Sequence, residues 1–414
     1  MPKAFDVAVV GGGAAGLTAS ISAGRSGRSV VVCERLPRPG KKILATGGGR
    51  CNLLNRDLSP DHFTSTSKDL VASVLARFGK KEILEFFRGL GLETIEDDSG
   101  DGRIFPVTNQ ASSVLRVLEI EARRVGVAVE SGFEVSTLGR AGDLFAVETA
   151  AGRRIEARSV VLAGGGKTYP ALGSNGSGHV LAAALGHRII KPVPSAVPII
   201  AKDRFCHLLH GLKLRAAATA VVAGNTTASA SGEVLFTQYG LSGTAVLDVS
   251  ESLSVAFNRE GKTDVSLTID FVPWASAETL AREFRRRLEA GWAAGDLAAG
   301  ILPDKFSSVM AGGDAPGARG ERDKARALAG ALKSRAFKVL GTRGWNEAEF
   351  TAGGVDAREI DPHTLESRRR KGLFLAGEII DVQGERGGYN LAWAWASGYI
   401  AGLAGLTDPK IGSC

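Results

Sequence analysis

The first third of the chain carries short apolar runs separated by glycine turns and small-residue segments. Residues 5–10 form an apolar run rich in β-branched side chains, which predicts a buried strand of a parallel sheet. Residues 17–26 follow as a small-residue helix, and residues 29–33 form a second buried strand. Two later runs, 159–163 and 372–375, repeat the pattern of a strand that ends in a glycine turn. This alternation predicts an α/β protein with a Rossmann-like parallel sheet.

The rhythm stops between about residues 191 and 349, where prolines mark the exit from the sheet. Three short β runs are predicted there, at 216–222, 233–236 and 265–271. Three helical stretches are predicted after them, at 276–291, 304–310 and 322–334. A glycine-rich loop is predicted at 312–320. Ser276 is expected to cap the first of these helices.

A chain of 414 residues is long enough for two or three domains of ~150 residues each. We predict a nucleotide-binding domain that is discontinuous in sequence and holds two inserted parts. The nucleotide-binding domain covers 1–190 and 350–414, a small inserted β domain covers 191–273 and 336–349, and a helical cap covers 274–335.

The composition excludes several classes of protein. Hydrophobic residues make up 44% and charged residues 23%, which excludes a disordered chain or a disulfide scaffold. The formal net charge of +7 suits phosphate-bearing ligands but is too diffuse to indicate nucleic acid. The four cysteines form no C-x-x-C pair, and the histidines show no grouping typical of zinc. We therefore expect no metal site and a reducing compartment, the cytoplasm.

The segment 387–406 is apolar enough to imitate a membrane span, and it carries the small-residue pair Gly398 and Gly402. It is mostly Ala and Gly, without the strongly apolar residues or anchoring charges that a span requires. We predict a buried helix packed on the sheet, and no membrane association.

A dinucleotide-binding fingerprint joins the first strand to the first helix. Gly11, Gly13 and Gly16 form G-x-G-x-x-G, and Glu34 ends the second strand 18 residues after Gly16, near the expected spacing of about 20. The first glycine permits the tight turn, the second lets the backbone approach a pyrophosphate, and the third lets helix and strand pack closely. Glu34 can accept hydrogen bonds from the ribose hydroxyls. The sequence therefore predicts a dinucleotide at this turn.

The rest of the chain favours FAD over NAD. The strand 159–163 ends in three glycines, and the run 372–378 repeats this pattern near the carboxyl end. Gly388 then opens the apolar helix, whose N-terminus could stabilise negative charge on a reduced flavin. No second fingerprint follows a strand, because Pro170 would break a phosphate-binding helix after the glycines at 164–166. A nicotinamide reductant would have to bind transiently at the flavin.

Several motifs in a fixed order make the chain resemble the BaiN-like (YhiN-like, aminoacetone-oxidase-like) flavoproteins. They are the segments 40–52, 102–106, 169–170, 173–178, 235–243, 351–355, 377–378 and 388–390. The resemblance spans nearly the whole chain and implies a two-dinucleotide-type FAD-binding fold with an inserted domain and non-covalent FAD.

The fingerprint and the resemblance together give a set of expected FAD contacts. They are Gly11, Gly13, Ala14, Ala15, Gly16, Glu34, Arg35, Lys42, Thr46, Gly47, Gly48, Arg50, Cys51, Asn52, Val135, Ala163, Gly164, Gly165, Gly377, Glu378, Asp381, Gly388, Tyr389, Asn390 and Leu391.

Three residues are candidates for the substrate face: Tyr169, Gln238 and Tyr239. A tyrosine can donate a proton or stabilise an enolate, although aromatic packing explains these positions equally well. Gln238 stands where similar proteins often have a histidine, and a glutamine cannot act as a pH-tuned acid or base. Cys51 has no partner cysteine nearby, so a structural or flavin-contacting thiol is favoured over a redox-active one.

We predict an FAD-dependent oxidoreductase in which flavin N5 exchanges a hydride with a small organic substrate. By resemblance, the first reaction class is NAD(P)H-driven reduction of a conjugated double bond. The alternatives are an oxygen-using amine or aminoketone oxidase, a flavin-containing RNA-modifying or RNA-binding protein, and a non-catalytic FAD sensor. The basic runs at 282–287 and 368–371 favour solvated faces over a nucleic-acid surface. The sequence carries no indication of the oligomeric state.

Overall fold

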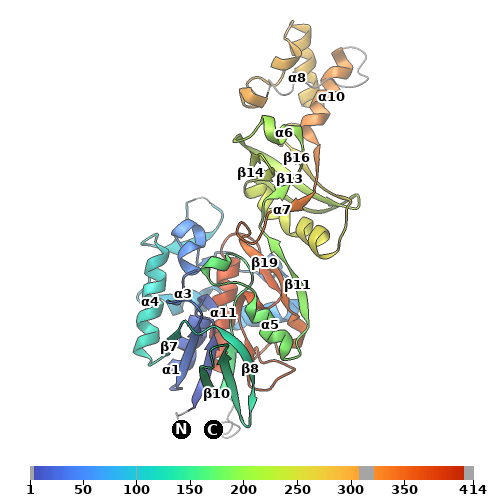
Figure 1. Ribbon diagram of the computed structural model, residues 1–414. Helices are drawn as coiled ribbons and strands as arrows, with labels where there is room; N and C mark the ends of the chain where they lie inside the picture. Colours follow the sequence, from blue (N-terminus) through green and yellow to red (C-terminus); the bar gives the residue numbers. More distant parts are fainter. Residues whose placement is uncertain (1–3, 99, 307–320, 405–414) are drawn as a thin grey trace. The chain divides into compact units, whose positions relative to one another are not determined.

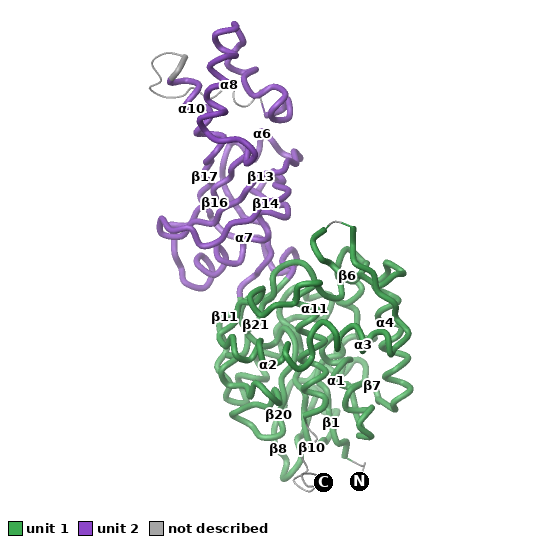
Figure 2. Tube along the Cα trace, turned by 180° about the vertical axis from the view of Figure 1, so that it is seen from behind, with its two compact units in different colours: residues 1–192, 350–414 green, residues 193–349 purple. Residues whose placement is uncertain are grey.

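The computed structural model describes residues 4–98, 100–306 and 321–404 (Figure 1). The chain forms two compact units, Met1–Pro192 with Phe350–Cys414 and Val193–Glu349 (Figure 2). Each unit has its own hydrophobic core. The further division of the second unit into a β domain and a helical cap stays a prediction.

The first unit is built on a seven-stranded sheet. Its path is β7-β2-β1-β10-β9-β8, and β20 also pairs with β10. The strands are β7 (Ala128–Ser131), β2 (Val30–Glu34), β1 (Phe5–Val10), β10 (Arg154–Leu162), β9 (Leu144–Thr149), β8 (Val135–Ala141) and β20 (Leu373–Leu375). The pairs β7–β2, β2–β1, β1–β10 and β10–β20 are parallel, whereas β9 pairs antiparallel with both β10 and β8.

The register of the parallel strands brings their carboxyl ends to one edge of the sheet. Val10 pairs with Leu162 in β10 and with Cys33 in β2, and Leu162 pairs with Leu375 in β20. Ligands of open α/β sheets bind outside the carboxyl ends of the strands. The predicted Rossmann-like parallel arrangement is confirmed, and it places the glycine turns after β1, β10 and β20 side by side.

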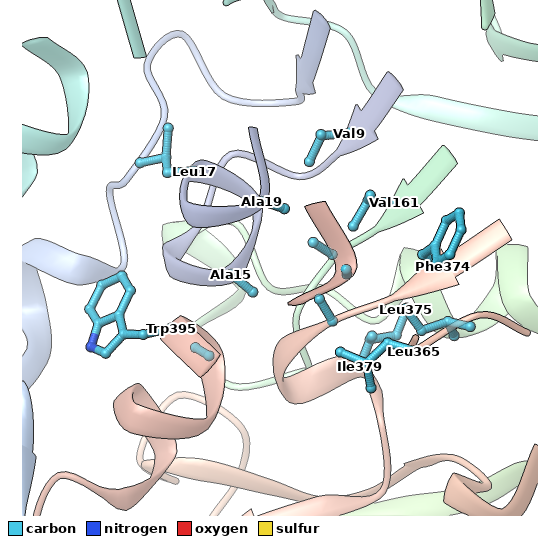
Figure 3. Packing of buried hydrophobic residues seen from close by; sticks show 14 of the residues in the cluster. Val9, Ala15, Leu17, Ala19, Val161, Leu365, Phe374, Leu375, Ile379 and Trp395 are labelled. Carbon is cyan, nitrogen blue, oxygen red and sulfur yellow. The ribbon is translucent and has the colours of Figure 1, made fainter. Parts of the chain in front are cut away.

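Two helices of the first unit pack tightly together, α1 (Ala14–Arg25) and α11 (Tyr389–Ala404). A Cβ at Gly398 would lie 2.3 Å from the carbonyl oxygen of Ala15, and one at Gly402 would lie 2.3 Å from that of Ala19. The small-residue pair therefore serves close packing between these two helices. Figure 3 shows side chains of α1, the strands and α11 gathered in this core, among them Leu17, Val161 and Trp395. Within the described residues, no helix is long and apolar enough to cross a membrane.

Smaller elements complete the first unit. They are the strands β3 (Leu54–Asn55), β4 (Phe63–Ser65), β5 (Thr94–Glu96), β6 (Arg103–Pro106), β11 (Ile189–Ser195), β19 (Phe350–Val355) and β21 (Val382–Gly384), and the helices α2 (Lys68–Arg77), α3 (Lys80–Gly89), α4 (Ala111–Arg124) and α5 (Ser177–Ala184). β4 pairs with β21, β3 and β5 pair with β6, and β11 pairs with β19.

The second unit is an antiparallel sheet with helices. The strand order is β17-β16-β13-β14-β15-β12-β18. The elements are β12 (Ile199–Ile200), β13 (Lys213–Val222), β14 (Asn225–Thr237), β15 (Gly240–Ser242), β16 (Val265–Asp270), β17 (Arg335–Lys338), β18 (Gly341–Thr342), α6 (Arg204–Leu208), α7 (Thr244–Ser254), α8 (Ala277–Glu289) and α10 (Glu321–Lys333).

Some of the sequence predictions for the second unit agree with the structure, and others do not. The three predicted β runs are parts of β13, β14 and β16, and Ser276 caps α8 by accepting the amide hydrogen of Thr279 at 3.1 Å. Helix α7 was not predicted, although its buried residues Val246, Val249 and Leu253 follow a helical spacing. The glycine-rich loop predicted at 312–320, and most of the helix predicted at 304–310, lie outside the described residues.

Candidate cofactor site at the carboxyl ends of the parallel strands

The fingerprint turn has the backbone geometry that each of its glycines requires. Gly11 has a φ of 103°, and a Cβ there would lie 2.5 Å from the carbonyl oxygen of Ala163 after β10. A Cβ at Gly16 would lie 1.8 Å from the carbonyl oxygen of Gly11. A Cβ at Gly13 would meet nothing within 4 Å, and no side chain caps the N-terminus of α1 that Gly13 precedes. This terminus is thus open to an anion.

Glu34 is held in place by backbone amides at the end of β2. Its Oε2 accepts the amide hydrogen of Gly12 at 2.7 Å, and its Oε1 accepts that of Leu36 at 2.8 Å. Each carboxylate oxygen can accept a second hydrogen bond, so the group keeps acceptor capacity for ribose hydroxyls. The neighbouring Arg35 forms an ion pair with Glu134 at 3.4 Å, and Val135 is buried at the start of β8.

A second cluster joins the ends of β10 and β20 to the glycine-rich segment. Lys42 Nζ lies 2.7 Å from Glu378 Oε2, 2.8 Å from Thr168 Oγ1 and 3.4 Å from Ser174 Oγ. Glu378 Oε1 accepts the amide hydrogen of Thr351 at 3.0 Å. Burial alone would raise the pKa of Glu378, but the positive charge of Lys42 and these hydrogen bonds hold it below its usual value. The carboxylate is therefore ionised at neutral pH.

Three members of this cluster were missed by sequence reasoning: Thr168, Ser174 and Thr351. Ser174 and Thr351 lie in the motifs 173–178 and 351–355, which carried the family resemblance without an assigned role. Only the fold reveals that these hydroxyl groups and the Lys42–Glu378 pair meet.

The glycine-rich segment presents an open surface and an unsatisfied acceptor. Gly47 and Gly48 have φ values of 56° and 65°, and a Cβ at Gly48 would meet nothing within 4 Å. Asn52 Oδ1 is buried and has no hydrogen-bond partner among the described residues. It lies 2.9 Å from the position of a Cβ at Gly388, which precedes α11. A buried acceptor without a donor costs free energy unless a ligand supplies the donor.

Cys51 is a buried thiol at a strained backbone position. Its φ is 60°, and its side chain is fully buried. Burial raises the pKa of the thiol to about 12, although a hydrogen bond with Thr46 opposes this effect. The thiolate is the nucleophile in cysteine chemistry, and it is scarcely populated at neutral pH here. The geometry supports the structural interpretation over the redox-active one.

The N-terminus of α11 is held by an aromatic and charged cluster. Tyr389 stacks on His62 with ring centroids 4.6 Å apart, and the His62 ring nitrogens lie 2.9 Å from Glu385 Oε2 and 3.2 Å from Asp57 Oδ2. Burial raises the pKa of Tyr389 to about 12, so its phenol stays protonated. Asn390 binds the backbone of Gly384 through both amide atoms. We infer that its side chain shapes the loop before α11.

The remaining expected contacts lie on the same turns. Ala14 and Ala15 form the first turn of α1, and a Cβ at Gly377 would lie 2.8 Å from the Cβ of Ala15. Arg50 lies over the ring of Phe105 at 4.3 Å. A Cβ at Gly164 would lie 3.2 Å from Gly178 Cα, and one at Gly165 would lie 3.0 Å from Ser174 Oγ. Asp381 donates its amide hydrogen to the carbonyl of Val355, and Leu391 packs against the core.

The candidates for the substrate face are divided between the two units. Tyr169 lies in the first unit, where it precedes a 3-10 turn with a φ of 52°. Gln238 and Tyr239 lie in the second unit, and the guanidinium of Arg343 sits 4.6 Å from the centre of the Tyr239 ring. Their catalytic roles stay predictions. Within the described residues, no cluster of three or more His, Cys, Asp or Glu could hold a metal ion.

Several arginines of the two basic runs form ion pairs. Arg286 and Arg287 both lie 2.7 Å from Glu283, and Arg369 lies 2.6 Å from Glu359. These contacts support the interpretation of the runs as solvated or structural faces.

Glu359 also belongs to a buried Ser–His–Glu arrangement. Ser367 Oγ lies 2.8 Å from His187 Nε2, and His187 Nδ1 lies 3.0 Å from Glu359 Oε2. Ser367 Oγ also accepts the amide hydrogens of Arg369 and Arg370 at 3.0 and 2.9 Å. Its lone pairs are therefore occupied, and the group supports the fold instead of acting as a nucleophile.

Comparison with known proteins identifies the family. The model described as "HI0933-like protein Rossmann domain" matches residues 5–404. The chain belongs to the HI0933-like family. This confirms the family predicted from the motifs, and it makes the chain an FAD-dependent oxidoreductase with a Rossmann-type fold.

The proteins to which this chain is similar have names that describe different substrates. The chain is 36% identical over 414 residues to a 3-dehydro-bile acid delta(4,6)-reductase of Clostridium scindens, covering 97% of this chain and 99% of that protein. It is 29% identical over 398 residues to a ribosomal RNA dihydrouridine synthase of Escherichia coli, covering 95% and 96%. The 3-ketosteroid-Δ4-(5α)-dehydrogenase of Rhodococcus jostii RHA1 shares the fold with a TM-score of 0.50 and 18% identity, over 98% of this chain and 97% of that one.

Proposed function

We propose that this HI0933-like protein reduces a carbon–carbon double bond conjugated with a carbonyl group. One observation carries the proposal: two nearly full-length relatives have different substrates but names that describe the same chemistry. A 3-dehydro-delta(4,6) compound has a ketone conjugated with ring double bonds. Dihydrouridine is uridine whose C5=C6 bond, conjugated with the C4 carbonyl, has been saturated. Both reactions add a hydride and a proton across an activated double bond.

The residues of the site fit FAD, and bound FAD would supply the two-electron chemistry. In this proposal the open N-terminus of α1 receives the pyrophosphate, and Glu34 accepts hydrogen bonds from the adenosine ribose. Asn52 offers its unsatisfied oxygen to a donor on the flavin ring. The N-terminus of α11 stabilises negative charge there. Gly48 leaves a surface without a side chain that would obstruct the ring, since a Cβ there would meet nothing within 4 Å.

We propose a small enone, of the kind found in 3-oxo steroids, as the first substrate class, because the reductase is the more similar of these two relatives. Uridine in RNA is the second candidate, since two dihydrouridine synthases match over nearly their whole length. The paired arginines add no support to the RNA candidate. NAD(P)H remains the proposed reductant, and the three unpaired cysteines of the described chain support the cytoplasm as the proposed compartment.

An anaerobic half-reaction experiment tests the proposal. The yellow protein is titrated with NADPH or NADH while the absorbance of the oxidised flavin is followed. The reduced protein is then mixed, still without oxygen, with a 3-oxo-Δ4 steroid, with the matching saturated ketone as control, or with a uridine-containing rRNA transcript. We expect bleaching by one nicotinamide and reoxidation by an enone or by the RNA.

The outcome separates the candidates. Reoxidation by the steroid but not by the saturated ketone supports the first substrate class. Dihydrouridine formed in the transcript, detected by mass spectrometry, supports the second. Reoxidation only by oxygen, with an amine as the reductant, would contradict the proposal and favour the amine oxidase alternative.

A further inference from the structure

Like Lys333–Asp270 in the second unit, the Lys42–Glu378 ion pair of the first unit is more buried than the exposed surface ion pairs. Its side chains are 25% and 22% exposed, and its two charged atoms lie 2.7 Å apart. The pair Lys262–Glu260 has the same separation, but its side chains are 49% and 43% exposed. Charges that are partly removed from water interact more strongly with other charges in their surroundings, because solvent screens them less.

The pair is also built into the glycine turns that form the candidate FAD site. A Cβ at Gly166, which follows β10, would lie 2.9 Å from Glu378 Cδ. A Cβ at Gly377, next to Glu378, would lie 2.8 Å from the Cβ of Ala15 in the first turn of α1. Lys42 leads into the open glycine-rich segment, which runs from residue 43 to residue 49. Three turns proposed to hold FAD therefore surround two fixed, opposite charges.

Both members of the Lys42–Glu378 pair make further hydrogen bonds in addition to their contact with each other. Lys42 also contacts the hydroxyl groups of Thr168 and Ser174, and Glu378 also accepts the amide hydrogen of Thr351. These contacts fix the positions of both charges. Charges that are already held in place can stabilise or destabilise a new charge nearby, and they do not have to move when that charge forms.

We infer that Lys42 and Glu378 set the reduction potential of the bound FAD. Reduction at neutral pH adds negative charge to a flavin. Lys42 favours this change, and Glu378 opposes it while holding Lys42 in place. The inference rests on the FAD-binding part of the proposed function, but it does not depend on the identity of the substrate.

The test measures the reduction potential in two variants whose charges change in opposite directions. Lys42→Met removes the positive charge and should lower the ratio of reduced to oxidised FAD at a fixed potential about tenfold, or about 30 mV for a two-electron couple. Glu378→Gln removes the negative charge and should raise that ratio by a similar factor. The measurement is equilibration with a reference dye, in protein reconstituted with FAD.

Two controls separate electrostatics from loss of structure. Thr168→Val removes a hydrogen bond to Lys42 without changing charge, and Lys262→Met removes an exposed charge of the same type. Neither should shift the potential in the manner of the charge variants. Lys42→Arg keeps the charge and should stay close to the parent protein.

Opposite shifts in the two charge variants support the inference, because a merely structural role would not produce opposite signs. Shifts in the same direction, or no shift in either, would overturn it. Loss of FAD from both charge variants even at excess FAD would also overturn it, by showing that the pair only holds the site together. A protein that binds FAD but reduces no enone would contradict the proposed reaction and leave this measurement feasible.

Discussion

Gly13 is the residue where the cofactor proposal can be tested most directly, because its surroundings are empty in the structure. A Cβ there meets no atom within 4 Å, so Gly13→Val should fold normally and block only a ligand that approaches the backbone. We expect FAD affinity to fall about hundredfold, or roughly 3 kcal/mol, measured by flavin fluorescence on titration. Gly139→Val is the matched control, since Gly139 in β8 is equally open. An FAD affinity of Gly13→Val equal to that of the parent protein would contradict the placement of the cofactor.

A substitution at Cys51 tests whether its thiol has a structural or a redox role. Its pKa of about 12 means that the thiol is protonated at neutral pH, and full burial shields it from reagents. We expect Cys51→Ser to retain FAD and to keep the rate of flavin reduction within about twofold. Native protein should leave Cys51 unmodified by iodoacetamide, as read by peptide mass spectrometry, whereas unfolded protein should be modified there. A much slower reduction step with unchanged FAD binding would restore a redox role for this thiol.

The helix pair α1 and α11 sets the geometry of the site at the scale of secondary structure, because α1 follows the fingerprint and α11 begins at the other end of the site. Gly398→Ala would place a Cβ 2.3 Å from the backbone oxygen of Ala15, so the helices must separate. We expect a loss of about 2 kcal/mol in the free energy of unfolding, measured in urea, together with weaker FAD binding.

The matched control for that helix contact is Gly89→Ala, in the last turn of α3, where a Cβ would meet nothing within 4 Å. It should leave stability unchanged or raise it by up to about 1 kcal/mol, because alanine favours a helix more than glycine does. Equal effects of the two substitutions would show that close packing of α1 against α11 does not limit stability.

The two units of the whole molecule have separate hydrophobic cores, and we place FAD in the first. A ligand stabilises only the unit that binds it, by about 2.7 kcal/mol at a concentration of 100 Kd. Calorimetry should therefore show two transitions, of which FAD raises one by roughly 5–10 °C. The Gly13→Val protein should show the same two transitions with no FAD-dependent shift. A single transition that moves as a whole would mean that the units unfold together.

Features that depend on residues close together in the sequence could be predicted, whereas contacts between residues far apart in the sequence could not. Apolar period, glycine positions and the spacing to Glu34 are local, so the strands β1 and β2, the fingerprint turn and the buried nature of α11 could be predicted from the chain alone. Inside the second unit, the apolar residues Val246, Val249 and Leu253 of α7 follow a helical spacing, but only the fold shows that they pack against β13 and β14.

The tertiary structure decided which distant residues share an environment. Lys42 meets Glu378 across 336 positions of sequence, and Thr168 joins them only because β1, β10 and β20 end at one edge of the sheet. The pKa of Cys51 likewise depends on burial, which no local pattern encodes. The chain alone therefore indicated the kind of cofactor and the turn that we propose for its phosphates. The fold decided which charges meet at the proposed cofactor site, because electrostatic environment depends on distance in space.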